Sequence, residues 1–468
     1  MDDFILAACI AVKIFFSLLR LGSMLSVKTK LSITNREIWS IAVPIMLGNL
    51  AQTIITFTDT AFLGHVGMIE LSASMMAGLY YFVYTTLAMG FARGVQIFVA
   101  RRYGENRADQ IGVVFFHGVV FVLGLGLLLL GLLYFCSGWL LPRIIASENI
   151  CTSAFEYLKY RQFGILFVVF NFLFRSFYVG ISHTRAITYS TLIMAVVNIF
   201  MDYCLIFGNF GFPCMGVGGA ALSSLSAECC AFCFFWIYTY FNVPRKYAMF
   251  RRHSLQPGLL QSILGVSFPC MLQSLFSFGS WFVFFVLIEK MGETAIGVSS
   301  LVRSVYMILI IPGFAFSATA NTLTSRIIGE GKSQQVKQLM GKICINALLC
   351  ASLLVLLVVL MPLTITRIFT DDLALAQEAV PVIYVIGVAT LIGALGMTVF
   401  ETVSGTGNTL VAMLMEAGVL CVYIAYIYLT SRNQTIQWVW TAEWLYNLCV
   451  GLISLIYLIK ANWSRKKI

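Results

Sequence analysis

The chain has 468 residues, of which 60% are hydrophobic and 11% are charged, and its mean hydropathy is +0.91. Soluble globular domains carry about 25% charged residues, so this composition excludes one and indicates a protein that crosses a membrane many times. The formal net charge is +10, but the basic residues follow the polar loops instead of forming one patch. This distribution argues against a nucleic-acid partner.

The sequence predicts an all-α polytopic membrane protein with twelve transmembrane helices, because apolar windows of about 18 residues or more recur between short loops. Residues 1–35 are predicted to be a cytoplasmic or interfacial segment. The predicted helices span 38–63, 70–95, 110–136, 155–180, 187–208, 216–241, 260–288, 294–318, 338–362, 378–403, 409–430 and 437–460. They form an N lobe at 36–241 and a C lobe at 259–460, joined by a cytoplasmic linker at 242–258 and followed by a basic cytoplasmic tail at 461–468.

The loops on one predicted side are rich in Arg and Lys, including Arg101, Arg102 and Arg326, whereas the opposite loops hold few. Cytoplasmic loops carry an excess of these residues, so both termini are predicted to be cytoplasmic. We expect a monomer in the plasma membrane, which is the inner membrane of a bacterium.

The segment from Pro44 to Gly67 recurs 225 positions later, from Pro269 to Gly292, with matched residues and no gap. The shift persists through later helices, which predicts one six-helix unit used twice. Two such units insert in the same direction and are related by a pseudo-two-fold axis along the membrane normal, an arrangement that secondary transporters use. Asp59 of the first copy meets Phe284 in the second, so the matched positions differ in chemistry.

Polar residues of three predicted helices lie at one depth, since each residue of a helix advances 1.5 Å. They are Asp59, Asn198, Asp202, Ala220 and Ser224. A charged side chain in a bilayer is costly and asks for a function. Two carboxylates, an amide oxygen, a hydroxyl and the Ala220 carbonyl suit a small hard cation, whereas the two acids could instead share a proton. A structural knot of hydrogen-bonded helices is the third interpretation.

These residues sit in PIMLGNLAQTIITFTDTAFLGHVG (44–67), NIFMDYCLIFG (198–208) and MGVGGAALSS (215–224). Together with the glycine turns at 179–182 and 404–408, these words resemble the multidrug and toxic compound extrusion (MATE) family over about residues 36–460. The resemblance implies a cation-coupled exporter of twelve helices. It places Asp59, Asn198, Asp202 and Ser224 at the family's N-lobe cation site, which would hold Na⁺ if the protein is sodium-coupled.

The chain departs from the family at helix 7, which has no carboxylate before Glu289, whereas one branch of the family has a C-lobe site there. Coupling is therefore expected to rest on the N lobe. Glu228 is a candidate substrate group or proton relay. Arg175 and Glu401 occupy near-equivalent repeat positions and are candidates for an inner gate between the lobes.

The leading hypothesis is a secondary antiporter that exports organic cations or other amphiphilic drugs in exchange for Na⁺ or H⁺ by alternating access, with no cofactor. A flippase for a lipid-linked sugar is the alternative within transport, although the spans hold few basic residues for a pyrophosphate. A membrane receptor or scaffold is the alternative of another class. An enzyme is not expected, because the sequence contains neither HExxH nor G-x-S-x-G.

Overall fold

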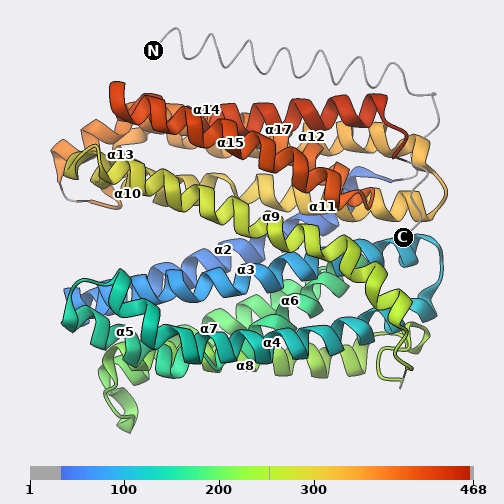
Figure 1. The fold of residues 1–468 in the computed structure, drawn as a ribbon, viewed down its shortest axis with the longest axis horizontal. Helices are drawn as coiled ribbons and strands as arrows, with labels where there is room; N and C mark the ends of the chain where they lie inside the picture. The colour runs from blue at the N-terminus through green and yellow to red at the C-terminus, as the bar shows by residue number, and fades with distance from the viewer. Residues whose placement is uncertain (1–32, 252, 371, 464–468) are drawn as a thin grey trace. The chain divides into compact units, whose positions relative to one another are not determined.

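A computed structural model describes residues 33–251, 253–370 and 372–463. Most of the predicted N-terminal segment at 1–35 and of the predicted tail at 461–468 lies outside these ranges. The described residues form helices joined by short connections, without a strand (Figure 1).

The first half of the chain contains α2 (Asn35–Val66), α3 (Met68–Gly104), α4 (Ala108–Ile144), α5 (Glu148–Arg161), α6 (Gly164–Gly180), α7 (Arg185–Phe207), η1 (Asn209–Gly211) and α8 (Gly216–Asn242). After η2 (Arg245–Tyr247), the second half contains α9 (Pro257–Glu289), α10 (Glu293–Leu309), α11 (Ile311–Gly329), η3 (Ser333–Gln335), α12 (Val336–Leu360), α13 (Pro362–Arg367), α14 (Leu373–Gly405), α15 (Thr409–Asn433), α16 (Ile436–Trp440) and α17 (Ala442–Lys460). In the described ranges, ten stretches are long and apolar enough to cross a membrane, and two bent helix pairs raise the number to 12. The prediction of an all-α, multi-pass membrane protein is thus confirmed.

Two predicted helices are broken, which corrects the sequence-based ranges. The predicted helix 155–180 is α5 followed by α6, with a bend of 55°. At the start of α6, a Cβ on Gly164 would lie 2.5 Å from the Glu228 carboxylate. The break therefore brings bare backbone against a buried charged group.

The predicted helix 294–318 is α10 followed by α11, with a bend of 44°. Pro312 lies in the first turn of α11, where its missing N–H and fixed φ suit a helix start but not a helix interior. The helix then continues to Gly329, well beyond the predicted end. A span needs only about 20 residues, so these helices extend past the apolar run that defined the prediction.

Several basic residues assigned to loops lie in helices instead. Arg101 and Arg102 belong to the last turn of α3, and Arg326 belongs to the last turn of α11. Arg101 is buried, and Arg326 donates from Nη1 to Glu37 Oε1 at 2.6 Å. These basic residues are therefore parts of helices, and Arg326 has a structural partner.

The chain divides into two compact units. Among the described residues, unit 1 takes those up to Met46, Gly104–Asn106 and those from Phe276 onward, and unit 2 takes those in Leu47–Tyr103 and Arg107–Leu275. Three helices contribute residues to both units: α2, α9 and, by its last residue Gly104, α3. The lobe boundaries predicted from the sequence therefore stay a prediction.

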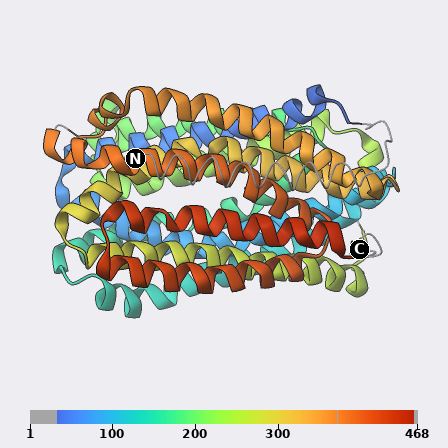
Figure 2. The same ribbon diagram turned by 90° about the horizontal axis from the view of Figure 1, so that it is seen from above.

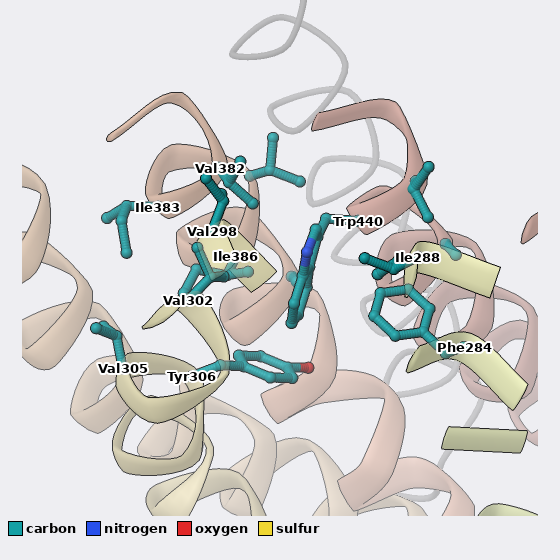
Figure 3. Close-up of a cluster of buried hydrophobic side chains, with 14 of the residues drawn as sticks. Phe284, Ile288, Val298, Val302, Val305, Tyr306, Val382, Ile383, Ile386 and Trp440 are labelled. Atoms are coloured by element: carbon teal, nitrogen blue, oxygen red, sulfur yellow. The ribbon is translucent and has the colours of Figure 1, made fainter. Parts of the chain in front are cut away.

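Unit 1 is organised around α14, which contacts α10, α11, α12 and α17. Figure 2 shows the orange and red helices of this unit running lengthwise beside one another. Its core contains Phe284, Tyr306, Ile386 and Trp440, which pack as drawn in Figure 3. Trp440 stands nearly perpendicular to Tyr306, with ring centroids 6.0 Å apart.

Unit 2 relies on close backbone approaches. The residues near the start of α8 are small, and a Cβ on Gly219 would come 2.6 Å from the Leu205 carbonyl oxygen of α7. Gly208, at φ +74°, ends α7 and turns the chain toward α8. The glycines therefore let α7 and α8 pack closely, which positions the polar residues of both helices.

Candidate functional site

The candidate site lies in unit 2, where α2 carries Asp59 and α7 carries Asn198 and Asp202. Asn198 and Asp202 are one turn apart on α7 and almost completely buried, at 1% and 0% exposure. The Asp59 carboxyl lies beside the side chains of both. The structure thus brings together three of the five residues that the sequence placed at one depth.

Polar atoms of these three side chains are buried without a hydrogen-bond partner. They are Asp59 Oδ1, both amide atoms of Asn198 and both carboxylate oxygens of Asp202. A buried polar group that lacks a partner is costly, and most such groups in proteins are satisfied. Clustered carboxylate and amide oxygens with free lone pairs are what a small hard cation or a shared proton would satisfy.

A third helix, α8, contributes a buried hydroxyl that was not among the residues predicted from the sequence. Ser223 is fully buried and interacts with Asp202, while its hydroxyl also donates to the Gly219 carbonyl at 3.0 Å. Ser224, chosen from the sequence, is only partly buried. Its neighbour Ser223 is thus the hydroxyl that sequence reasoning missed.

Ala220 belongs to an apolar cluster with Leu63, Ile206 and Val217. The proposed roles of the Ala220 carbonyl and of the Ser224 hydroxyl stay predictions.

Glu228 of α8 is held in a buried ion pair with Arg161 of α5. Arg161 donates from Nη1 to Oε2 at 2.7 Å and from Nη2 to Oε1 at 2.5 Å, and the two side chains are 13% and 11% exposed. The guanidinium also lies over the Tyr81 ring, 4.1 Å from its centroid. Such a bidentate, stacked arginine is strongly fixed.

Arg161 lies within electrostatic range of Asp59 as well, and so does Glu228. The ion pair and the Asp59 cluster therefore belong to one electrostatic network inside unit 2. Sequence reasoning singled out Glu228 but missed Arg161 and Tyr81 as its partners. The signal in the sequence was Arg161 itself, a basic residue inside the predicted span 155–180, which indicates a buried acidic partner.

The candidate gate residues lie in different units. Arg175 is on α6 and is partly buried. Glu401 is on α14, where Oε2 accepts a hydrogen bond from Asn321 Nδ2 at 2.9 Å. The proposed gate stays a prediction.

The donor set bears on which ion could bind. Across the described ranges, no three His, Cys, Asp or Glu side chains are grouped as a metal site. Two carboxylates, one amide and one hydroxyl fit a monovalent cation better than a transition metal, which prefers nitrogen or sulfur ligands.

Two helical halves of repeated sequence and a buried acidic site within one half are features of a secondary transporter. The MatE family model matches residues 44–204 and again residues 269–429, with the same shift of 225 positions in both bounds. The chain therefore belongs to the MATE family. It is a transporter and not an enzyme.

Curated relatives include the probable multidrug resistance protein NorM of Thermotoga maritima, which is 27% identical over 383 residues covering 81% of this chain and 82% of the relative. The protein of the same name from Synechocystis is 26% identical over 65% of this chain and 66% of its own length. The one from Agrobacterium fabrum is 31% identical over 45% of this chain and 46% of its own length.

Solved structures share the fold at low sequence identity. A MATE protein in complex with the ligand MaL6 aligns with a TM-score of 0.82 and 19% identity, over 90% of this chain and 95% of its own. A variant of the Vibrio cholerae MATE transporter VcmN aligns with a TM-score of 0.82 and 17% identity, over 92% and 98%. These likenesses support the fold of twelve helices in two six-helix halves.

Proposed function

We propose that the protein is a secondary antiporter that exports organic cations or amphiphilic drugs in exchange for Na⁺ or H⁺. The observation that carries the proposal is the Asp59, Asn198 and Asp202 cluster, whose buried atoms lack hydrogen-bond partners. A cation that neutralises the two acids binds more tightly to a conformation that holds them together than to one that separates them. Such differential affinity is what couples an ion to a conformational change.

Na⁺ and H⁺ use the cluster differently. Na⁺ would be held by both carboxylates with the Asn198 amide oxygen and the Ser223 or Ser224 hydroxyl, since hard cations prefer oxygen ligands. A proton would be shared by the two acids, because neighbouring carboxylates in a poorly solvated site do not both stay ionised. Either ion satisfies the same unpartnered oxygens.

The names of the curated relatives, which describe probable multidrug resistance proteins, support drugs as substrates. Fold alone does not fix the substrate's charge, since a Pyrococcus furiosus relative of the same fold is described as having a binding pocket of reversed polarity. Buried acids favour a cationic substrate here, and the aromatic content of 14% supplies ring faces that attract organic cations. Glu228 is a poorer candidate for a relay than the sequence suggested, because Arg161 occupies both of its oxygens.

The test is export from vesicles that contain the purified protein, under a Na⁺ gradient and a H⁺ gradient imposed separately. We expect one gradient to drive export, and Asp59→Asn and Asp202→Asn to abolish that coupled export without preventing insertion. The exposed Asp109 in the first turn of α4 provides the matched control, and Asp109→Asn is expected to export normally. Wild-type rates in both site variants would contradict the assignment.

A further inference from the structure

Glu443 of unit 1 is a second buried acid that the cation cluster does not include. It lies in the first turn of α17 and is 5% exposed. Its Oε1 accepts a hydrogen bond from Tyr423 Oη at 2.8 Å, and its Oε2 accepts one from Tyr306 Oη at 3.1 Å. The phenols come from α15 and α10, so three helices meet at this carboxyl.

No basic side chain of the described residues pairs with this carboxyl. Arg303 of α10 lies instead over the Phe285 ring, 5.2 Å from its centroid, and Arg432 of α15 lies over Tyr428 at 4.1 Å. The titratable groups that face Glu443 are Tyr306, Tyr423 and Tyr446. Glu443 therefore differs from Glu228, which has an arginine on both oxygens.

The acids nearest to this region on the neighbouring elements have partners of their own. Glu416 of α15 accepts hydrogen bonds from Ser277 and Tyr446, at 2.5 and 2.8 Å. Glu401 of α14 accepts from Asn321. Neither acid is hydrogen-bonded to Glu443 in these contacts, so Glu443 is a separate buried carboxyl.

The surroundings of Glu443 are apolar and tightly packed. Tyr306, Trp440 and Phe284 belong to the buried cluster shown in Figure 3. The Trp440 ring contacts both of the other rings. On the next turn of α17, Asn447 lies against α14, where a Cβ on Gly393 would be 3.4 Å from the Asn447 side chain. This packing suits a proton, which needs no coordination volume, better than a hydrated metal ion or an organic cation.

We propose that Glu443 binds and releases a proton during the transport cycle, as a second proton site separate from the Asp59 cluster. The proposal rests on the export function proposed above. A buried carboxyl without a counter-ion favours its neutral form. In that form one oxygen can donate to one phenol while the other oxygen accepts from the second phenol.

The two phenols also make the charged form attainable. When Glu443 gives its proton to water, the carboxylate accepts hydrogen bonds from both Tyr306 and Tyr423, and hydrogen bonds to a charged group are the stronger ones. Every buried carboxyl needs hydrogen-bond partners, but those of Glu443 are neutral phenols, and no cationic side chain in the part of the chain that the structure describes locks it in the charged form. The pair of phenols therefore allows proton exchange at this position.

The repeat shows that this site is particular to the second half. In the matched ranges, a shift of 225 positions relates Tyr423 to Asn198 and Phe284 to Asp59. The second half thus has an aromatic ring at both positions, and its acid Glu443 lies beyond the matched range. Reasoning from matched positions alone would not find it.

The test uses infrared difference spectra of the purified full-length protein between acidic and alkaline buffer. We expect a protonated-carboxyl C=O band that Glu443→Gln removes and that Asp59→Asn leaves in place. Tyr423→Phe removes one hydrogen bond and is expected to move the band to higher frequency. This second variant keeps the proposal testable if Glu443→Gln fails to fold.

Vesicle export then relates the site to transport. We expect Glu443→Gln to flatten the dependence of export on pH, and Glu416→Gln to serve as a matched control. A difference spectrum that Glu443→Gln and Tyr423→Phe both leave unchanged would overturn the proposal. Because the spectra need no transport, a failure of the proposed export function would not affect them.

Discussion

Arg161 is the residue whose replacement should cost the most stability in unit 2. Arg161→Leu leaves the Glu228 carboxylate, which is 11% exposed, without its bidentate partner. Breaking a buried pair by removing one partner costs about 3 to 5 kcal/mol. Glu228→Gln is expected to cost less, because the amide oxygen still accepts one hydrogen bond from the guanidinium.

Removing both charges should restore most of the loss. Replacing a buried ion pair by apolar residues of similar volume is often neutral or stabilising by about 1 to 4 kcal/mol. The double variant Arg161→Leu with Glu228→Leu also keeps a side chain against the Tyr81 ring. We therefore expect its stability to be close to that of the wild type.

The assay is reversible unfolding in mixed micelles, with the free energy of unfolding compared across the four proteins. Arg143→Leu is the matched control, because Arg143 is exposed and lies over the Trp139 ring at 4.0 Å. Its loss is expected to be below about 1 kcal/mol. The reasoning fails if Arg161→Leu costs no more than the control, or if the double variant recovers nothing.

Three further predictions follow from the structure and the repeat. Gly90→Ala should lower the free energy of unfolding by about 1 to 3 kcal/mol, because the added Cβ would lie 2.5 Å from the Met271 Cα. Gly131→Ala is the control, because its Cβ meets open space and the same unfolding measurement should show no such loss. One-for-one exchange of a monovalent drug moves no net charge, so a voltage worth about 2.3 kcal/mol per charge per 100 mV would not drive it. Export in response to voltage alone, with that stoichiometry demonstrated, would contradict this expectation. Arg175→Glu and Glu401→Arg should each slow export and the double swap should restore it, and silent single variants would end the gate hypothesis.

The amino-acid sequence was sufficient to predict the class of fold, because apolar length and the 225-residue repeat are properties of single stretches. It was not sufficient to find the break near Gly164, and the break near Pro312 was missed although a proline is a local signal of a helix start. At the Gly164 break the backbone lies against Glu228, which is far away in the sequence. A local pattern contains no such information.

The site shows the same limit. Asn198 and Asp202 are one turn apart, so their common face follows from helical geometry. The partner of Glu228 lies 67 residues away, and a residue that distant cannot be paired by spacing. Choosing Ser223 over Ser224 requires the rotation of α8, because adjacent residues of a helix point about 100° apart.

The two halves match the same family model but carry different polar and charged residues at corresponding positions. The first half holds Asp59 and Asn198 where the second holds Phe284 and Tyr423, and Arg161 corresponds to Ile386, a core residue. An ion can shift a conformational equilibrium only through its different affinity for the two states. On the proposed sites, Na⁺ would therefore act through the first half alone, whereas a proton could act through both. Export driven by a Na⁺ gradient should thus require Asp59 but not Glu443, whereas export driven by a H⁺ gradient should depend on both acids. Comparing Asp59→Asn with Glu443→Gln under each gradient measures that difference.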